Sequence, residues 1–211
     1  MLEKYEDILA RVRGDGEYHS IKSLVQPGDA EVMAVAAILS GSANFVSACQ
    51  DFVDSFTTYR REVGDYWTTP EEIMAAACPV CRSYEMALED ERLNIYRCLS
   101  CGYQGEPARA GDCDDKAILL TSLLRYQLPP EAVCCAFGLH RLNGDTEGHM
   151  WVITEHDGGD RIVEATAPAA AALKGNYQLM AFFNDKYAYA SPEGIREFNL
   201  KPVKEKVYAE I

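Results

Sequence analysis

The chain has 211 residues, 48% of them hydrophobic and 25% charged, which is the balance of an ordinary soluble globular protein. Its formal net charge of -13 argues against nucleic acid or an anionic membrane as a partner, because both recruit basic surfaces. The length suits one domain with a substantial core, no stretch approaches the ~20 apolar residues of a membrane span, and the N-terminus lacks the apolar core of a signal peptide, so we expect a cytoplasmic protein.

The first part of the chain predicts helices. Residues 1–25 carry no pattern from which we infer a function, but residues 30–39 and the segment after Gly41-Ser42 have helical character. The second segment places apolar side chains on one face, which indicates core packing rather than a binding role. These side chains are Phe45, Cys49, Phe52, Val53 and Phe56.

A further helix start follows. Thr69 and Glu72 have the spacing of a capping box and Pro70 falls at the first helical position, so we expect a short helix through Ala77. Trp67, just before this cap, is either a core anchor or a wall of an active-site cleft.

Four cysteines form two CxxC knuckles, Cys78 with Cys81 and Cys98 with Cys101, separated by 16 residues. Two knuckles at this spacing predict a zinc ribbon, in which four thiolates hold one Zn²⁺ in a tetrahedral shell. Because such a shell has no open position, we expect the zinc to be structural; a disulfide pair or an unmetallated loop is the alternative. Three arginines and four acidic residues lie between the knuckles, which is too little positive charge for a nucleic-acid contact.

Cys113 stands at the predicted tip of a buried helix. Asp112 and Asp114 suit the cap and first turn of a helix, and the residues from Ala117 onward are almost all apolar, so this helix is expected to be buried on nearly every face. A helix N-terminus lowers the pKa of a thiol, but the neighbouring carboxylates act in the opposite sense. A thiolate here would therefore need a cationic partner, for which His149 is the candidate.

Strands follow the helix. Residues 133–139 predict a buried strand, residues 149–154 a second, and residues 161–165 a third that returns after a short loop. With a loop of two or four residues, Glu164 lies diagonally across from His149 on the same face. A loop of three or five residues would place it on the other face.

The C-terminal part is less informative. Residues 177–190 are aromatic and strand-like, with a turn at Asn184-Asp185. The tail from Lys201 mixes lysine and glutamate with scattered apolar residues, which indicates a surface end.

A cysteine on a helix tip, with a histidine and a carboxylate on adjacent strands, is an arrangement of nucleophile, base and orienting group. We expect Cys113 to attack an amide or ester carbonyl, His149 to shuttle the proton, and Glu164 to fix the imidazole tautomer. The backbone N–H of Cys113 is a natural oxyanion donor, and the indole N–H of Trp67 is a possible second one. The alternative is that Cys113 is one more buried thiol and His149 a hydrogen-bonded strand histidine.

The combined motifs resemble those of the transglutaminase-like superfamily, most closely its bacterial and archaeal cysteine-proteinase-like branch. In that branch a W-x-T-P-E-E segment precedes G-D-C-[DE]-D; here WTTPEE stands at residues 67–72, GDCDD at 111–115 and GHMWV at 148–152. The resemblance covers roughly residues 27–168, apart from the ribbon. It implies a papain-like α+β fold, in which a helix carrying the nucleophile packs on an antiparallel sheet, and it gives the nucleophile and base roles to the same cysteine and histidine.

Two features depart from that family pattern. The third triad member is usually an aspartate in a D-P-T-like segment, whereas Glu164-Ala165-Thr166 stands here, and the four-cysteine ribbon interrupts the region before the nucleophile. Cytosolic peptide:N-glycanases resemble the second arrangement, although their G-R-C-G-E-W-like nucleophile segment is not what stands here. Deglycosylation of asparagine-linked glycopeptides is therefore the alternative activity. A third possibility is a catalytically idle module whose ribbon contacts a protein partner.

We therefore predict an α+β, transglutaminase-like core in three parts. They are an N-terminal helical part at residues 1–77, an inserted zinc ribbon at 78–101, and a core helix with an antiparallel sheet at 102–211. The predicted activity is hydrolysis or acyl transfer at amide bonds of a protein or peptide substrate. Hydrolysis is favoured because no calcium-site signature is visible.

Overall fold

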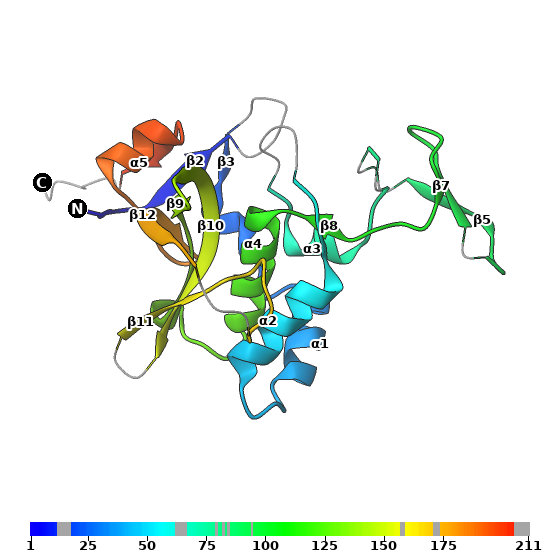
Figure 1. Cartoon of the computed structure of the whole chain (residues 1–211), viewed down its shortest axis with the longest axis horizontal. Coiled ribbons are helices and arrows are strands. Elements are labelled where there is room, and N and C mark those ends of the chain that lie inside the picture. Colours follow the sequence, from blue (N-terminus) through cyan, green and yellow to red (C-terminus); the bar gives the residue numbers. More distant parts are fainter. Residues whose placement is uncertain are drawn as a thin grey trace, which may run out of the picture.

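The computed structural model describes residues 1–11, 18–61, 67–78, 80–81, 83, 85–93, 95–156, 159–170 and 174–204. Over these residues the chain is a mixed α+β protein with antiparallel sheets, which confirms the predicted fold class at that level. A six-stranded antiparallel sheet forms its largest layer (Figure 1). The strand order is β1 (Glu3–Tyr5), β13 (Ala188–Ala190), β12 (Asn176–Phe183), β9 (Val133–Leu142), β10 (Asp145–His156) and β11 (Gly159–Val163).

Helix α4 (Cys113–Leu124) is the centre of the core. It packs against β9 and β10 on one side and against α1 (Ala30–Leu39), α2 (Phe45–Phe56) and α3 (Pro70–Met74) on the other (Figure 1). Every residue from Asp115 to Leu124 is buried, as the apolar sequence of this segment predicts. The N-terminal tip of α4 is thereby held at a fixed place beside the sheet.

The three earlier helices begin where their capping residues stand. The Asp29 carboxylate accepts two backbone N–H bonds of 3.0 Å at the start of α1, and the Asn44 side chain accepts one of 3.1 Å from Ser47 at the start of α2. Helix α3 has the predicted capping box between Thr69 and Glu72. It ends at Met74, before the expected Ala77. In the described part of the chain, no helix is both long and apolar enough to cross a membrane.

The two ends of the described chain pair with each other. Strand β2 (Asp7–Ala10) lies between β3 (His19–Ser20) and β14 (Lys201–Val203) in a small antiparallel sheet. Lys201–Val203, at the start of the expected surface end, therefore form a sheet strand in which Lys201 is exposed, and residues 205–211 lie outside the described residues. The short helical segments are η1 (Ile21–Leu24), which contacts β2 and β3, η2 (Pro130–Ala132), which contacts β9 and β10, and α5 (Pro192–Glu197), which contacts β12.

The cysteine knuckles lie in a separate three-stranded sheet that projects from the body (Figure 1). Its strands are β5 (Met86–Asp90), β6 (Ile95–Cys98) and β7 (Gln104–Gly105), so the sheet extends four residues beyond the second knuckle. Ala77 and Ala108 bridge at its base. From there the chain returns through β8 (Ala110–Gly111), which pairs in parallel with β4 (Thr58–Tyr59) and leads directly into α4.

Two tight hairpins fix which side chains of β10 face the helix. Between β9 and β10, Asn143 and Gly144 both have positive φ, 53° and 94°, as a two-residue type I′ turn requires. Between β10 and β11, His156 pairs with Gly159, so the loop is Asp157-Gly158, which lies outside the described residues. This is the two-residue spacing for which the sequence predicts Glu164 on the same face as His149.

Candidate active site

The Asp115 carboxylate holds the tip of α4, where Cys113 lies, against the segment before α3. The backbone N–H of Asp112 donates to the Asp115 carboxylate (3.2 Å), and the N–H of Thr68 donates to the other oxygen of the same carboxylate. This carboxylate, on a residue with no exposed surface, ties the segment before α3 to the helix tip. A Cβ at Gly111 would lie 2.6 Å from the Asp115 Cβ, so the close approach requires glycine.

His149 and Glu164 form the predicted pair. His149 Nε2 lies 2.9 Å from Glu164 Oε2, and the side chains are only 11% and 10% exposed. Burial by itself would raise the pKa of Glu164, but hydrogen bonds from His149 and Thr166 hold that pKa below its ordinary value. An ionised carboxylate only accepts hydrogen bonds, so Nε2 carries the hydrogen and Nδ1 is the basic nitrogen.

Three side chains outside the predicted set hold Glu164 in place. Thr166 donates to Oε1 from both its backbone N–H (3.1 Å) and its hydroxyl (2.8 Å), and the Tyr177 hydroxyl donates to Oε2 (2.9 Å). The Gln50 amide donates to the Glu164 carbonyl oxygen (2.8 Å). The departure from the family's aspartate therefore leaves a carboxylate that is fully engaged by hydrogen bonds.

The Cys113 thiol lies against the strand that carries His149, since it takes a hydrogen bond from the backbone of Met150. Burial raises the pKa of this thiol, Asp114 and Asp112 raise it further, and the Met150 bond lowers it by less. The expected lowering at a helix N-terminus is thus outweighed by burial and the two carboxyl groups. These effects together favour the protonated thiol over the thiolate at Cys113.

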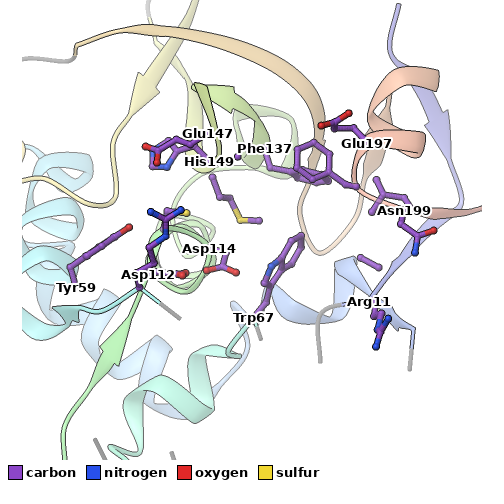
Figure 2. A pocket seen from close by; sticks show the side chains of 17 residues that line it. Arg11, Tyr59, Trp67, Asp112, Asp114, Phe137, Glu147, His149, Glu197 and Asn199 are labelled. Carbon is purple, nitrogen blue, oxygen red and sulfur yellow. The ribbon is translucent and has the colours of Figure 1, made fainter. Parts of the chain in front are cut away.

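Cys113 and His149 line one pocket, whose cavity volume is about 440 Å³. Figure 2 shows Tyr59, Glu147 and His149 towards one end of this pocket and Phe137, Asn199 and Arg11 towards the other. The pocket thus joins the Cys113 thiol and the His149 imidazole to a space large enough for part of a peptide.

Trp67 fulfils both roles that the sequence leaves open. Its ring is packed edge-on to Phe137 (centroids 5.7 Å apart) and parallel to Phe183 (6.3 Å), so it is anchored in the core. The same residue lines the pocket beside Cys113 (Figure 2). Its role as an oxyanion donor stays a prediction.

Sequence reasoning misses two residues beside the base. Tyr177 lies directly opposite His140 on the neighbouring strand, and the His140 and His149 rings are 5.3 Å apart. Tyr177 and His140 could be identified only by knowing that β12 pairs with β9, and this pairing depends on contacts between residues far apart in the sequence. Tyr59 is also missed; it lines the pocket, and burial together with Cys113 and Asp112 raises its pKa to about 12.

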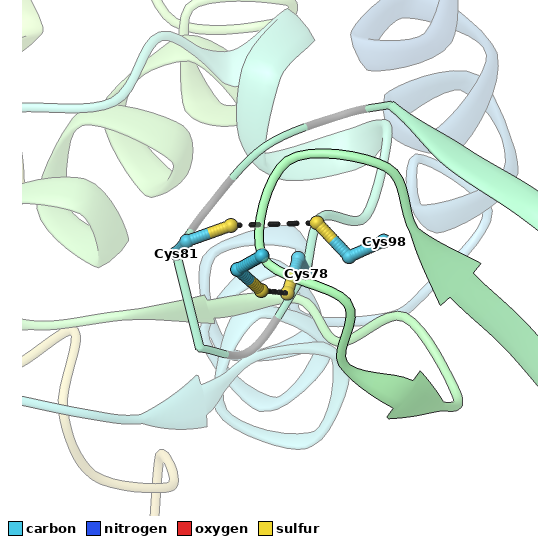
Figure 3. A group of neighbouring side chains, drawn as sticks. Cys78, Cys81 and Cys98 are labelled. Carbon is cyan, nitrogen blue, oxygen red and sulfur yellow. Dashed lines mark hydrogen bonds between the residues drawn. The ribbon is translucent and has the colours of Figure 1, made fainter.

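The four knuckle cysteines come together as predicted (Figure 3). The Sγ atoms of Cys78 and Cys101 are 3.7 Å apart, those of Cys81 and Cys98 are 3.4 Å apart, and all four lie within 4.8 Å of one another. A disulfide needs about 2.05 Å, whereas tetrahedral Zn–S bonds of about 2.3 Å place sulfurs about 3.8 Å apart. The donor set and its spacing fit a closed four-thiolate metal site.

The remaining cysteines are structural, as their apolar surroundings predict. Cys49 and Cys135 are buried and Cys134 is half-buried. Burial raises the pKa of Cys49 and of Cys134 to about 12.

In comparisons of the chain with protein-family models, with curated proteins and with solved structures, no match was found.

Proposed function

We propose that the protein is a cysteine-dependent amide hydrolase or acyltransferase of the transglutaminase-like type, with Cys113 as nucleophile, His149 as base and Glu164 as orienting group. The observation that carries the proposal is the 2.9 Å contact between His149 and Glu164 in a pocket that also contains the helix-tip thiol. The packing of α4 on the antiparallel sheet supports the papain-like arrangement that the motifs imply.

In the proposed reaction the thiol is deprotonated as it attacks. His149 Nδ1 takes the proton while Sγ bonds to the carbonyl carbon, and the carbonyl oxygen becomes an oxyanion that accepts the N–H of Cys113. The C–N bond then breaks and His149 returns the proton to the leaving amine. Water, or an amine in the transfer reaction, attacks the thioester and releases the sulfur with its proton. General-base attack suits a thiol whose pKa is raised.

The pocket end beside the thiol supports a polypeptide substrate more than a polyanion. Four acidic side chains line the pocket against two basic ones, Arg11 and Arg61, so a nucleic acid would meet an excess of like charge; the acidic ones are Asp112, Asp114, Glu147 and Glu197. A peptide amide is neutral and needs only an oxyanion donor and a proton shuttle. Protein or peptide amides are therefore the proposed substrate class.

The ribbon is proposed to bind one structural Zn²⁺. Cys78, Cys81, Cys98 and Cys101 would complete its coordination shell, so the metal would stabilise the ribbon and take no part in the reaction. The assembled ribbon upstream of the nucleophile also keeps peptide:N-glycanase-like deglycosylation as a second candidate activity.

The experiment is acyl-enzyme trapping followed by turnover assays. Wild type, Cys113→Ala and His149→Ala are offered an activated ester, then panels of peptide amides and a denatured glycopeptide, with Cys134→Ala as a control that also loses one thiol. We expect a thioester on Cys113 alone and turnover that both active-site substitutions abolish. Conversion of asparagine to aspartate in the glycopeptide would select the second candidate. Turnover that Cys113→Ala leaves unchanged would refute the proposal, and a wild-type protein that neither forms the thioester nor turns over any substrate would favour an idle module.

A further inference from the structure

The pocket continues from the thiol into a slot with aromatic walls, whose end is also lined by Arg11, Glu197 and Asn199 (Figure 2). Phe137 and Met150 are each 2% exposed and form its base, while Trp67 and Phe198 are only partly buried. The Phe198 ring stands edge-on to Phe137 (centroids 5.0 Å apart, planes at 83°), and Trp67 meets Phe137 from another side at 5.7 Å. Leu200 adds a further apolar side chain. An apolar group entering here would meet three rings.

The walls of the slot are held by backbone interactions. Phe198 N–H donates to Gly194 (3.1 Å), and Asn199 has a positive φ of 48°, which turns the chain so that Leu200 N–H reaches Ile195 (2.9 Å). Strand β14 then anchors the segment to β2. The slot is therefore a formed feature of the fold, present before any ligand arrives.

The direction of the slot relative to the base decides which part of a substrate enters it. His149 must give its proton to the leaving amine, so the leaving part lies at the end of the pocket that holds His149. Figure 2 shows Phe137 towards the opposite end, with Trp67 beside it. The acyl part of the substrate, which stays on the sulfur, extends that way.

We propose that this slot is a specificity site for a large apolar, preferably aromatic, side chain on the acyl side of the cleaved or transferred amide. The inference rests on the proposed function and adds the substrate class to it. Gly148 lies beside the slot: a Cβ there would be in ordinary contact with Phe198 Cε1, at 3.8 Å, and a larger side chain would extend towards this ring.

The test scans one phenylalanine through an alanine-glycine octapeptide and locates the cleaved bond by mass spectrometry. We expect cleavage within two residues after the phenylalanine, so that this residue stays on the acyl fragment. We also expect kcat/KM at least about tenfold above that of the all-alanine peptide. Phe198→Ala, which enlarges the slot, and Gly148→Val, which fills it, should both reduce this ratio. Phe182→Ala is the matched control, because its ring stacks on Tyr189 outside the pocket.

A binding arm keeps the inference testable without turnover. Fluorescence polarisation measures the same labelled peptides on Cys113→Ala, where the phenylalanine peptide should bind at least about tenfold more tightly than the alanine peptide. If this preference appears and Phe198→Ala removes it, the slot stands even when no Cys113-dependent cleavage occurs and the proposed function fails. Cysteine-dependent cleavage that ignores the phenylalanine, or leaves it on the amine fragment, would overturn the slot alone.

Discussion

The carboxyl groups of Asp112 and Asp114 lower the reactivity of the proposed nucleophile, Cys113, which they flank. After burial, they are the main causes that raise the pKa of the Cys113 thiol. The double substitution Asp112→Asn and Asp114→Asn removes their charge at nearly constant volume. Asparagine is as good an N-cap as aspartate, so the start of α4 is preserved. We expect the double variant to have a more reactive Cys113.

The size of the effect follows from the geometry. The pKa of Asp114 is raised well above its ordinary value by burial and by a hydrogen bond with Asp112, so the pair is counted as one negative charge. The two carboxyl groups and the sulfur lie within 4.8 Å of one another. One charge at that distance contributes about 0.9 kcal/mol in water and about 3.5 kcal/mol at an effective dielectric constant of 20. This corresponds to a pKa lower by about 0.6 to 2.5 units. Alkylation near neutral pH should then be about 2-fold to 25-fold faster, because a lower pKa also makes the thiolate less nucleophilic.

The assay is the rate of iodoacetamide labelling at Cys113 from pH 6 to 9, read by mass spectrometry of the digested protein. Cys134 is the internal reference thiol. The control Glu31→Gln with Glu193→Gln also removes two carboxylates, both on exposed residues of other helices. A folded double variant that labels no faster than wild type would refute the electrostatic reasoning.

Four further outcomes are expected. Cys98→Ser should lower bound zinc from one per chain and remove amide exchange protection from the ribbon while the melting temperature of the core shifts little, because the ribbon is a separate sheet. Tyr177→Phe should lower kcat about tenfold at unchanged KM, since Glu164 loses one donor worth about 1.4 kcal/mol. The pKa of Glu164 is lower in the folded protein than the value of about 4.3 in the unfolded chain, so its carboxylate stabilises the fold above that value and the stabilisation is lost as the pH falls through the folded pKa. We expect Glu164→Gln to make the free energy of unfolding, measured in urea, depend less on pH between about pH 5 and 3. Gly111→Ala should lower the free energy of unfolding by about 1–3 kcal/mol, because its Cβ overlaps Asp115.

Each of these has an outcome that contradicts it. Full zinc content in Cys98→Ser would remove that cysteine from the metal site. A Tyr177→Phe enzyme with wild-type kcat would show that its hydroxyl does not support catalysis. An unchanged pH slope in Glu164→Gln, or an unchanged unfolding midpoint in Gly111→Ala, would show that the corresponding contact adds no stability in solution.

Local signals predict the helices and the histidine–carboxylate pair. Helix α1 begins at the predicted residue because Asp29 caps its N-terminus, and it ends at Leu39, as predicted. The sequence predicts that His149 and Glu164 share a face if the loop between their strands has an even number of residues, and the pairing of His156 with Gly159 gives the two-residue spacing. The ribbon sulfurs assemble as predicted because each knuckle brings two of them into one turn.

Other features depend on contacts that no local pattern contains. Tyr177 reaches Glu164 only because β12 pairs with β9, and the paired strands at the two ends of the described chain are too short for an alternating pattern to show. The sequence shows the opposing influences on the pKa of Cys113, a helix N-terminus that lowers it and neighbouring carboxylates that raise it. It does not show how deeply the sulfur is buried, and burial is the largest cause of the raised pKa. The burial of the sulfur is a property of the assembled fold.

The pairing of β2 with β14 has a consequence for biosynthesis. The far wall of the pocket is made by Ala10 and Arg11 from the beginning of the chain and by residues 198–200 from near its end. A ribosome-bound chain that has already made Cys113, His149 and Glu164 still lacks that wall. The Cys113 thiol therefore acquires its complete surroundings only after residues 198–200 have been translated, so a nascent chain would carry the proposed reacting groups without the wall of the pocket that we propose selects the substrate.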